Sequence, residues 1–117
     1  MLEILRAGNL DEARAEIKKI GASDHGTELM APKMLHFSIK IRDLDVKAAN
    51  IIKLLMLAVN GDAAIHGDVF DWKTQKSDAI IMGTLKQIRQ LVDRLEGEPY
   101  GLNELRKNLK ELVDQYK

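Results

Sequence analysis

Three histidines are the only imidazole groups of this chain. None of them has a second histidine four residues away, the spacing that places two metal ligands on one helix face. His36 and His66 fall on predicted strands, so they could still meet in the folded chain. A small enzyme that uses His36 and His66 with nearby carboxylates is therefore one hypothesis, and surface or strand-end histidines are the simpler interpretation.

A second candidate is the transition from a predicted strand into a predicted helix at Gly83-Thr84. Thr84, with Gln87 three residues later, forms a capping-box pattern, and Lys86 adds a positive charge. Free N–H groups and the helix dipole attract anions to such a helix start, and Gly83 would let a phosphate approach closely. We predict an anion-binding site of Gly83, Thr84 and Lys86 for a phosphate-bearing small molecule. The spacing of a Walker motif is missing, and an ordinary capped turn remains the alternative.

A third candidate is the polar side of the clearest strand, which carries His36, Ser38 and Lys40. These residues alternate with apolar ones, namely Leu35, Phe37, Ile39 and Ile41. A period of two sends one set to a core and the other to solvent or a partner surface. The strand is therefore expected at a sheet edge or in a sheet with one open face.

The composition excludes several classes of site. The chain has no cysteine, which removes disulfides, thiolate catalysis, Cys-ligated zinc and iron–sulfur clusters. Lys and Arg total 18, as do Asp and Glu, and the two signs are interleaved. A nucleic-acid binder usually has a basic surplus or stripe, so no nucleic acid is expected as a partner. No catalytic residue, metal or cofactor is predicted.

The elements that must position these residues alternate between helix and strand within 117 residues, enough for one domain over 1–117. Residues Ala22–Lys33 read as an irregular connection, with one helical turn before Pro32 as an open alternative. Residues Gly67–Lys76 read as a loop or a marginal hairpin arm with Phe70 and Trp72. Helices are predicted over Leu10–Ile20, Asp45–Val59, Leu85–Leu95 and Leu102–Gln115, and strands at Leu2–Ile4, Leu35–Arg42, Ala63–Ile65 and Ala79–Met82. The expected class is α/β, with three to five strands, about four helices, a βαβ unit and no barrel.

The helix predicted over Asp45–Val59 is apolar on most of its sides. A helix of this kind is buried by more than one neighbour. The C-terminal helix could cover it, or a second copy of the chain could do so across a two-fold axis. We favour a homodimer that uses Leu55. The most apolar stretch, Ile51–Val59, is too short to cross a membrane, so a cytoplasmic protein without a membrane partner is expected.

Six short motifs in order resemble the N-terminal extension that precedes the barrel in some bacterial and archaeal dihydropteroate synthases. The likeness runs from about Leu2 to Leu112. The motifs are Met30-Ala31-Pro32-Lys33, His36, Lys47-Ala48-Ala49-Asn50, Gly61-Asp62-Ala63-Ala64, Met82-Gly83-Thr84-Leu85-Lys86-Gln87 and Gly101-Leu102. The chain departs from the family pattern at Leu54-Leu55, where a Gln-Glu pair is usual, and at Asn60-Gly61, where two glycines are usual.

This resemblance implies a role in folate or pterin biosynthesis, with a dihydropteroate-synthase-type barrel domain or protein as partner. The synthase reaction takes place on a (β/α)₈ barrel, which needs about 250 residues. The family's catalytic residues therefore have no positions here. The leading hypothesis is a non-catalytic accessory domain that acts through protein contacts. The alternatives are the anion-binding module at Gly83-Thr84 and the small enzyme using His36 and His66.

Overall fold

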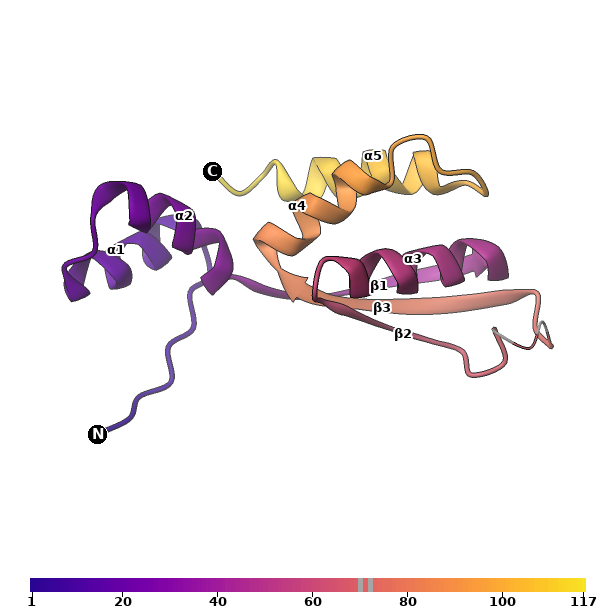
Figure 1. The fold of residues 1–117 in the computed structure, drawn as a ribbon, viewed down its shortest axis with the longest axis horizontal. Coiled ribbons are helices and arrows are strands. Elements are labelled where there is room, and N and C mark those ends of the chain that lie inside the picture. The colour runs from indigo at the N-terminus through magenta and orange to yellow at the C-terminus, as the bar shows by residue number, and fades with distance from the viewer. Residues whose placement is uncertain (70, 72) are drawn as a thin grey trace.

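A computed structural model describes residues 1–69, 71 and 73–117. The described residues form five helices and an open sheet of three antiparallel strands (Figure 1). The elements are α1 (Leu10–Ile20), α2 (Asp24–Met34), β1 (His36–Asp45), α3 (Val46–Ala58), β2 (Asp62–Ile65), β3 (Lys76–Thr84), α4 (Leu85–Arg94) and α5 (Leu102–Val113). The small α/β class without a barrel is confirmed, with one helix more than expected.

The sheet has the order β1-β3-β2, and both outer strands run antiparallel to β3. β1 and β2 are therefore parallel to each other and are joined through α3, which gives the predicted βαβ unit with β3 inserted between its strands. Ile81 pairs with Ile39 on one side and with Ala63 on the other. The apolar run Ala79–Met82 is thus interior, as predicted, and β1 is an edge strand.

The core lies between one face of the sheet and the helices that cover it (Figure 1). Ile81 of β3, Ile52 and Met56 of α3, and Leu85 and Ile88 of α4 are completely buried there. Alternate residues of the strands point to the other face, which no helix covers within the described chain (Figure 1). His36, Ser38 and Lys40 lie on that exposed face, where Ser38 pairs with Met82 and Lys40 with Ile80.

Helix α1 begins and ends where its sequence predicts. The Asn9 side chain accepts the Glu12 N–H at 2.8 Å, and Gly8 donates to the Glu12 carboxylate at 2.7 Å. Gly21 adopts the left-handed conformation at φ 94° and donates its N–H to the Lys18 carbonyl. The capping signals at both ends are therefore used as the sequence indicates.

Helix α2 corrects the prediction of an irregular connection over Ala22–Lys33. Ser23 caps it by accepting the Gly26 N–H at 3.0 Å, and Thr27 and Ala31 are buried. The prediction rested on the Ser, Asp, Gly, Thr and Pro residues of this segment, which are typical of loops, but Pro32 lies in the last turn of the helix. There the missing N–H removes one hydrogen bond without interrupting a longer helix.

Two strand predictions also differ from the structure. Residues 1–7, with the strand predicted at Leu2–Ile4, form no strand, because no neighbouring strand pairs with them among the described residues. β1 extends past Arg42 to Asp45 through a bulge in which Asp43 has a φ of 57° and donates its N–H to Asp78. The described residues of the 67–75 segment form a loop, while Phe70 and Trp72 lie outside the described residues.

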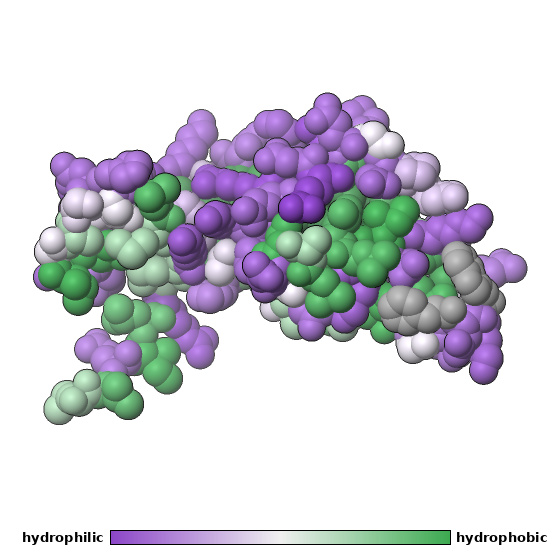
Figure 2. All heavy atoms as spheres, in the orientation of Figure 1, coloured by the Kyte–Doolittle hydropathy of each residue, from purple (hydrophilic) through white to green (hydrophobic). Residues whose placement is uncertain are grey.

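Helix α5 packs on α4 rather than along α3. Arg106 donates to the Val92 carbonyl at 3.1 Å and Arg89 to the Tyr116 carbonyl at 2.9 Å, which ties the C-terminal segment to α4. Leu54 and Leu57 of α3 therefore stay 56% and 48% exposed. Figure 2 shows hydrophobic atoms gathered on the surface over this helix.

Candidate functional site

The start of α4 is closed by bonds within the fold. Thr84 Oγ1 accepts the Gln87 N–H at 3.3 Å, and Gln87 Oε1 accepts the Thr84 N–H at 2.8 Å, so the predicted capping box is confirmed. The Leu85 N–H donates to the Leu35 carbonyl at 2.9 Å. Three N–H groups at this helix start therefore already have acceptors, and the anion site of Gly83, Thr84 and Lys86 stays a prediction.

Gly83 is needed by the packing around this turn. A Cβ atom at Gly83 would lie 2.9 Å from Gln87 Oε1 and 3.3 Å from Met56 Cε. The space that the glycine leaves is thus filled by the capping side chain and a core methionine. Close packing by itself explains why a glycine stands at position 83, so the glycine is no evidence for a bound phosphate.

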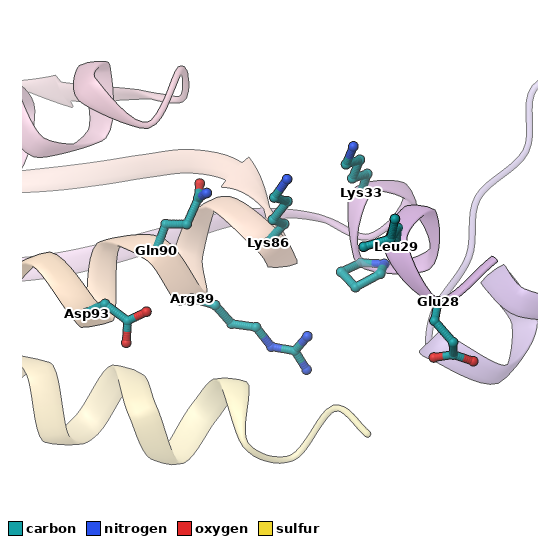
Figure 3. Close-up of a pocket in the computed structure, with 8 residues that line it drawn as sticks. Glu28, Leu29, Lys33, Lys86, Arg89, Gln90 and Asp93 are labelled. Atoms are coloured by element: carbon teal, nitrogen blue, oxygen red, sulfur yellow. The ribbon is translucent and has the colours of Figure 1, made fainter. Parts of the chain in front are cut away.

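A groove lies beside this turn, between α2 and α4, with a volume of about 380 Å³ (Figure 3). Its lining is mostly apolar, and Leu29 and Pro32 contribute to it from α2. The other lining residues are Glu28, Lys33, Lys86, Arg89, Gln90 and Asp93. Ligand sites typically have volumes of about 300–1,000 Å³ and combine an apolar lining with a few polar groups, and this groove fits that description.

Three cations border the groove. Figure 3 shows Lys33 and Lys86 projecting to one side of it, while Arg89 points from α4 toward the C-terminal segment, where it donates to the Tyr116 carbonyl at 2.9 Å. Lys33 and Lys86 make no ion pair with any described side chain, whereas Glu28 is paired with Arg14 at 3.0 Å. The two lysines are therefore the groups of this groove that are available to an anion, since Arg89 and Glu28 already have partners.

Sequence reasoning found one of these three cations, Lys86, and missed Lys33 and Arg89. The wall that α2 provides was predicted to be irregular, so no groove could be expected there. One signal in the sequence could have indicated α2: Ser23 is a suitable N-cap, and the eleven residues that follow it form the helix.

The two strand histidines lie far apart. His36 pairs with Thr84 at one end of β3, whereas Ile65, the residue before His66, pairs with Ala79. Five residues of strand correspond to about 17 Å. His66 instead accepts the Asp68 N–H through Nδ1 at 3.0 Å. The structure therefore does not bring His36 and His66 into one site, and the hypothesis of an enzyme built on both loses its geometric basis.

The start of β2 is held by a lysine of α3. Lys53 Nζ donates to the Asp62 carboxylate at 2.7 Å and to the Ala63 carbonyl at 2.8 Å. The hydrogen bond from Lys53 lowers the pKa of Asp62 below its usual range, and the Ala63 N–H acts in the same direction. This carboxylate is therefore held ionised in a structural contact.

Across the described ranges, no three His, Asp or Glu side chains come together as a metal site would require. Within the same ranges, none of the helices has the length and apolar character needed to cross a membrane.

Comparison with known proteins places most of the chain alongside part of longer folate enzymes. A probable bifunctional folylpolyglutamate synthase/dihydropteroate synthase of Halobacterium salinarum is 29% identical over 103 residues, which cover 88% of this chain and 12% of that protein. A bifunctional dihydropteroate synthase/dihydropteroate reductase of Helicobacter pylori is 28% identical over 107 residues, or 92% of this chain and 28% of that protein. A Haloferax volcanii protein with the same name as the Halobacterium one is 26% identical over 106 residues.

No family model matches the chain, and no solved structure does. The chain spans between 12% and 28% of the length of these curated relatives. It therefore matches a segment of bifunctional dihydropteroate synthase proteins.

Proposed function

We propose that this chain is a domain of dihydropteroate-synthase-type proteins that works outside the barrel and contributes to reduction of a dihydropterin. The observation that carries the proposal is the size of the match to the Helicobacter protein, whose name gives it two activities. The aligned 107 residues are 28% of that protein, so about 275 residues remain. That remainder suffices for one barrel of about 250 residues and little else. The second named activity is then left for the segment that this chain matches.

The resemblance of the motifs implies a place for the segment ahead of the barrel, and we include that place in the proposal. The chain forms an open three-stranded sheet, so it supplies no part of a closed barrel. Its contribution would be additional to the synthase reaction that takes place on the barrel.

The groove between α2 and α4 is the site that suits this chemistry best. Dihydropteroate carries flat rings and, on its benzoate ring, a carboxylate, and the groove combines an apolar lining with Lys33 and Lys86. Reduction adds a hydride to the carbon and a proton to the nitrogen of the remaining C=N bond of the pterin. The hydride would come from a reduced nicotinamide or flavin as co-substrate. The volume of about 380 Å³ suits one ring system, and we assign it to the benzoate ring that carries the carboxylate, with the pterin at the mouth of the groove where a co-substrate can reach it.

The test is an assay of the purified chain with dihydropteroate, reduced nicotinamide nucleotide, and free flavin present or absent. We expect tetrahydropteroate to form, and Lys86→Gln to lower kcat/KM by about ten- to a hundredfold, because a hydrogen bond to a charged group contributes about 1.5–3 kcal/mol. Lys107→Gln, on the exposed side of α5, is the matched control and should leave the rate unchanged. Absence of product with every donor would overturn the proposal.

A second candidate is the non-catalytic accessory domain, favoured by the exposed apolar surface of α3 around Leu54 and Leu57. Its proposed occupant is the synthase barrel, because the relatives carry both the matched segment and a synthase in one polypeptide. Sedimentation of the chain with a dihydropteroate synthase barrel lacking this segment should show a complex that Leu54→Glu weakens. Leu55, chosen from sequence, is a poorer probe since it packs against the core.

A further inference from the structure

We propose that residues 1–6 of one copy add as a fourth strand to the free edge of β1 in a second copy. The proposal does not depend on the proposed function. It starts from a mismatch: Leu2 and Ile4 alternate with Glu3 in the pattern of a strand, yet residues 1–6 pair with no strand of the described chain. Leu2 and Ile4 are 100% and 85% exposed. Isolated apolar side chains are common on surfaces, but an extended strand-like segment of them is a candidate for pairing.

The edges of the sheet differ in how well they are protected. β2 is only four residues long, and α3 reaches its start through Lys53. β1 is ten residues long, and the bulge at Asp43 interrupts its pairing after Ile41. Short strands and bulges are devices that block edge pairing. The regular part of β1, His36–Ile41, lacks both devices, and its six residues match the length of the segment 1–6.

The side chains on the two segments are complementary. Phe37 and Ile39 point to the helix-covered face but stay half-buried, since they lie at the free edge. In an antiparallel register that places Glu3 opposite Lys40, Ile4 lies opposite Ile39 and Leu2 opposite Ile41. Strand side chains alternate between the faces, so Leu2 and Ile4 then point to the helix-covered face and Glu3 to the open face. There Glu3 would meet Lys40, the exposed cation of this part of β1. Opposite charges on neighbouring strands stabilise the pairing, and the apolar pairs would extend the core.

The strand that pairs with β1 comes from a second copy, because residues 1–6 of the same chain run away from the free edge of its own β1. Ala7 packs against the core, and the Gly8 N–H donates to Glu12 at 2.7 Å, which fixes the point of exit. Figure 1 shows residues 1–6 running away from the sheet rather than along β1. Exchange of the segments between two copies would satisfy both edges at once, in the closed arrangement of a two-fold dimer.

Cysteine cross-linking tests this arrangement directly, since the chain has no cysteine of its own. Chains carrying Glu3→Cys are mixed with chains carrying Lys40→Cys and oxidised mildly. Opposed residues in antiparallel strands lie about 4.5–5.5 Å apart at Cα, within disulfide range. We expect the mixed dimer to form roughly ten times faster than with Glu3→Cys and Arg94→Cys, because pairing raises the effective concentration of the thiols. Equal rates for the two mixtures would overturn the proposal.

Two further measurements separate the alternatives. A single chain that carries both Glu3→Cys and Lys40→Cys should give covalent dimers. A fast-migrating cross-linked monomer would show that the segment pairs within its own chain, and this result would also overturn the proposal. Sedimentation should show a dimer that Ile4→Ser weakens and Ile20→Ser does not, both being exposed isoleucines. A chain that remains monomeric at every concentration, or equal effects of the two substitutions, would count against the proposal.

Discussion

The start of α4 and the groove along its exposed side lie within about one turn of each other, but the fold uses them very differently. At the start, the N–H groups of Thr84, Leu85 and Gln87 have acceptors in the chain. In the groove, Lys33 and Lys86 have no ion-pair partner among the described side chains. A motif rich in donors is therefore a weak indicator of binding when the same donors stabilise the local turn. Charged side chains that line a groove and have no ion-pair partner are a better indicator of a binding site.

The largest contrast should come from the two faces of α4. Ile88→Ala removes a completely buried side chain and should destabilise the chain by about 2–5 kcal/mol, because it leaves a cavity under β3. Gln90→Ala, on the groove side of the same helix, should change stability by less than about 0.5 kcal/mol. Urea unfolding followed by circular dichroism measures both. Comparable losses would mean that the groove side is packed.

Gly83→Val tests whether the helix start is closed. The new side chain would begin 2.9 Å from Gln87 Oε1 and would displace the cap, at a cost of about 1–3 kcal/mol. Gly8→Val is a suitable control, since its Cβ would meet its nearest neighbour at an ordinary 3.5 Å. A Gly83→Val variant as stable as the control would show open space at this turn, as an anion site requires. Since the variant also disturbs the cap, loss of binding by it alone would not identify the site.

Much of the fold follows from local signals in the sequence. Caps at Asn9 and Thr84 and the stop at Gly21 give the ends of α1 and the start of α4. Period-two and continuous apolar patterns identify β1 and β3, including their edge and interior places. These features depend on neighbours along the chain, so the sequence contains them explicitly.

The candidate site and the pairing of residues 1–6 depend on contacts between distant segments. The groove needs α2, whose loop-like composition hides the helix, and it needs α4, which is more than fifty residues away. The strand pattern at Leu2–Ile4 is real as a pattern, but a strand also needs a partner. The apolar character of α3 indicates an additional cover; in the structure Leu54 and Leu57 lack one within the described residues.

Thr84→Ala sharpens the comparison with a smaller effect. It removes the acceptor of the Gln87 N–H and should cost about 1 kcal/mol, the usual value for loss of an N-cap side chain. Gln87→Ala should cost a similar amount, and the double variant less than the sum of the two, because both halves of the capping box depend on each other. Denaturant midpoints of the three variants measure this coupling. Strict additivity would show that the two bonds form independently.

The last prediction has the smallest effect on stability. It decides whether pteroate, which carries a carboxylate, binds in the groove or at the start of α4. Lys86→Gln should alter stability by less than about 0.5 kcal/mol, because Lys86 is exposed and unpaired among the described residues. In an amide NMR titration with pteroate, the groove predicts the largest shifts at Leu29 and Gln90, with weaker binding in Lys86→Gln. Binding at the helix start predicts instead that the N–H signals of Gly83 and Thr84 move most. For the Thr84 N–H, that outcome would require the bond to Gln87 to break, and it would show that a ligand can displace the capping box.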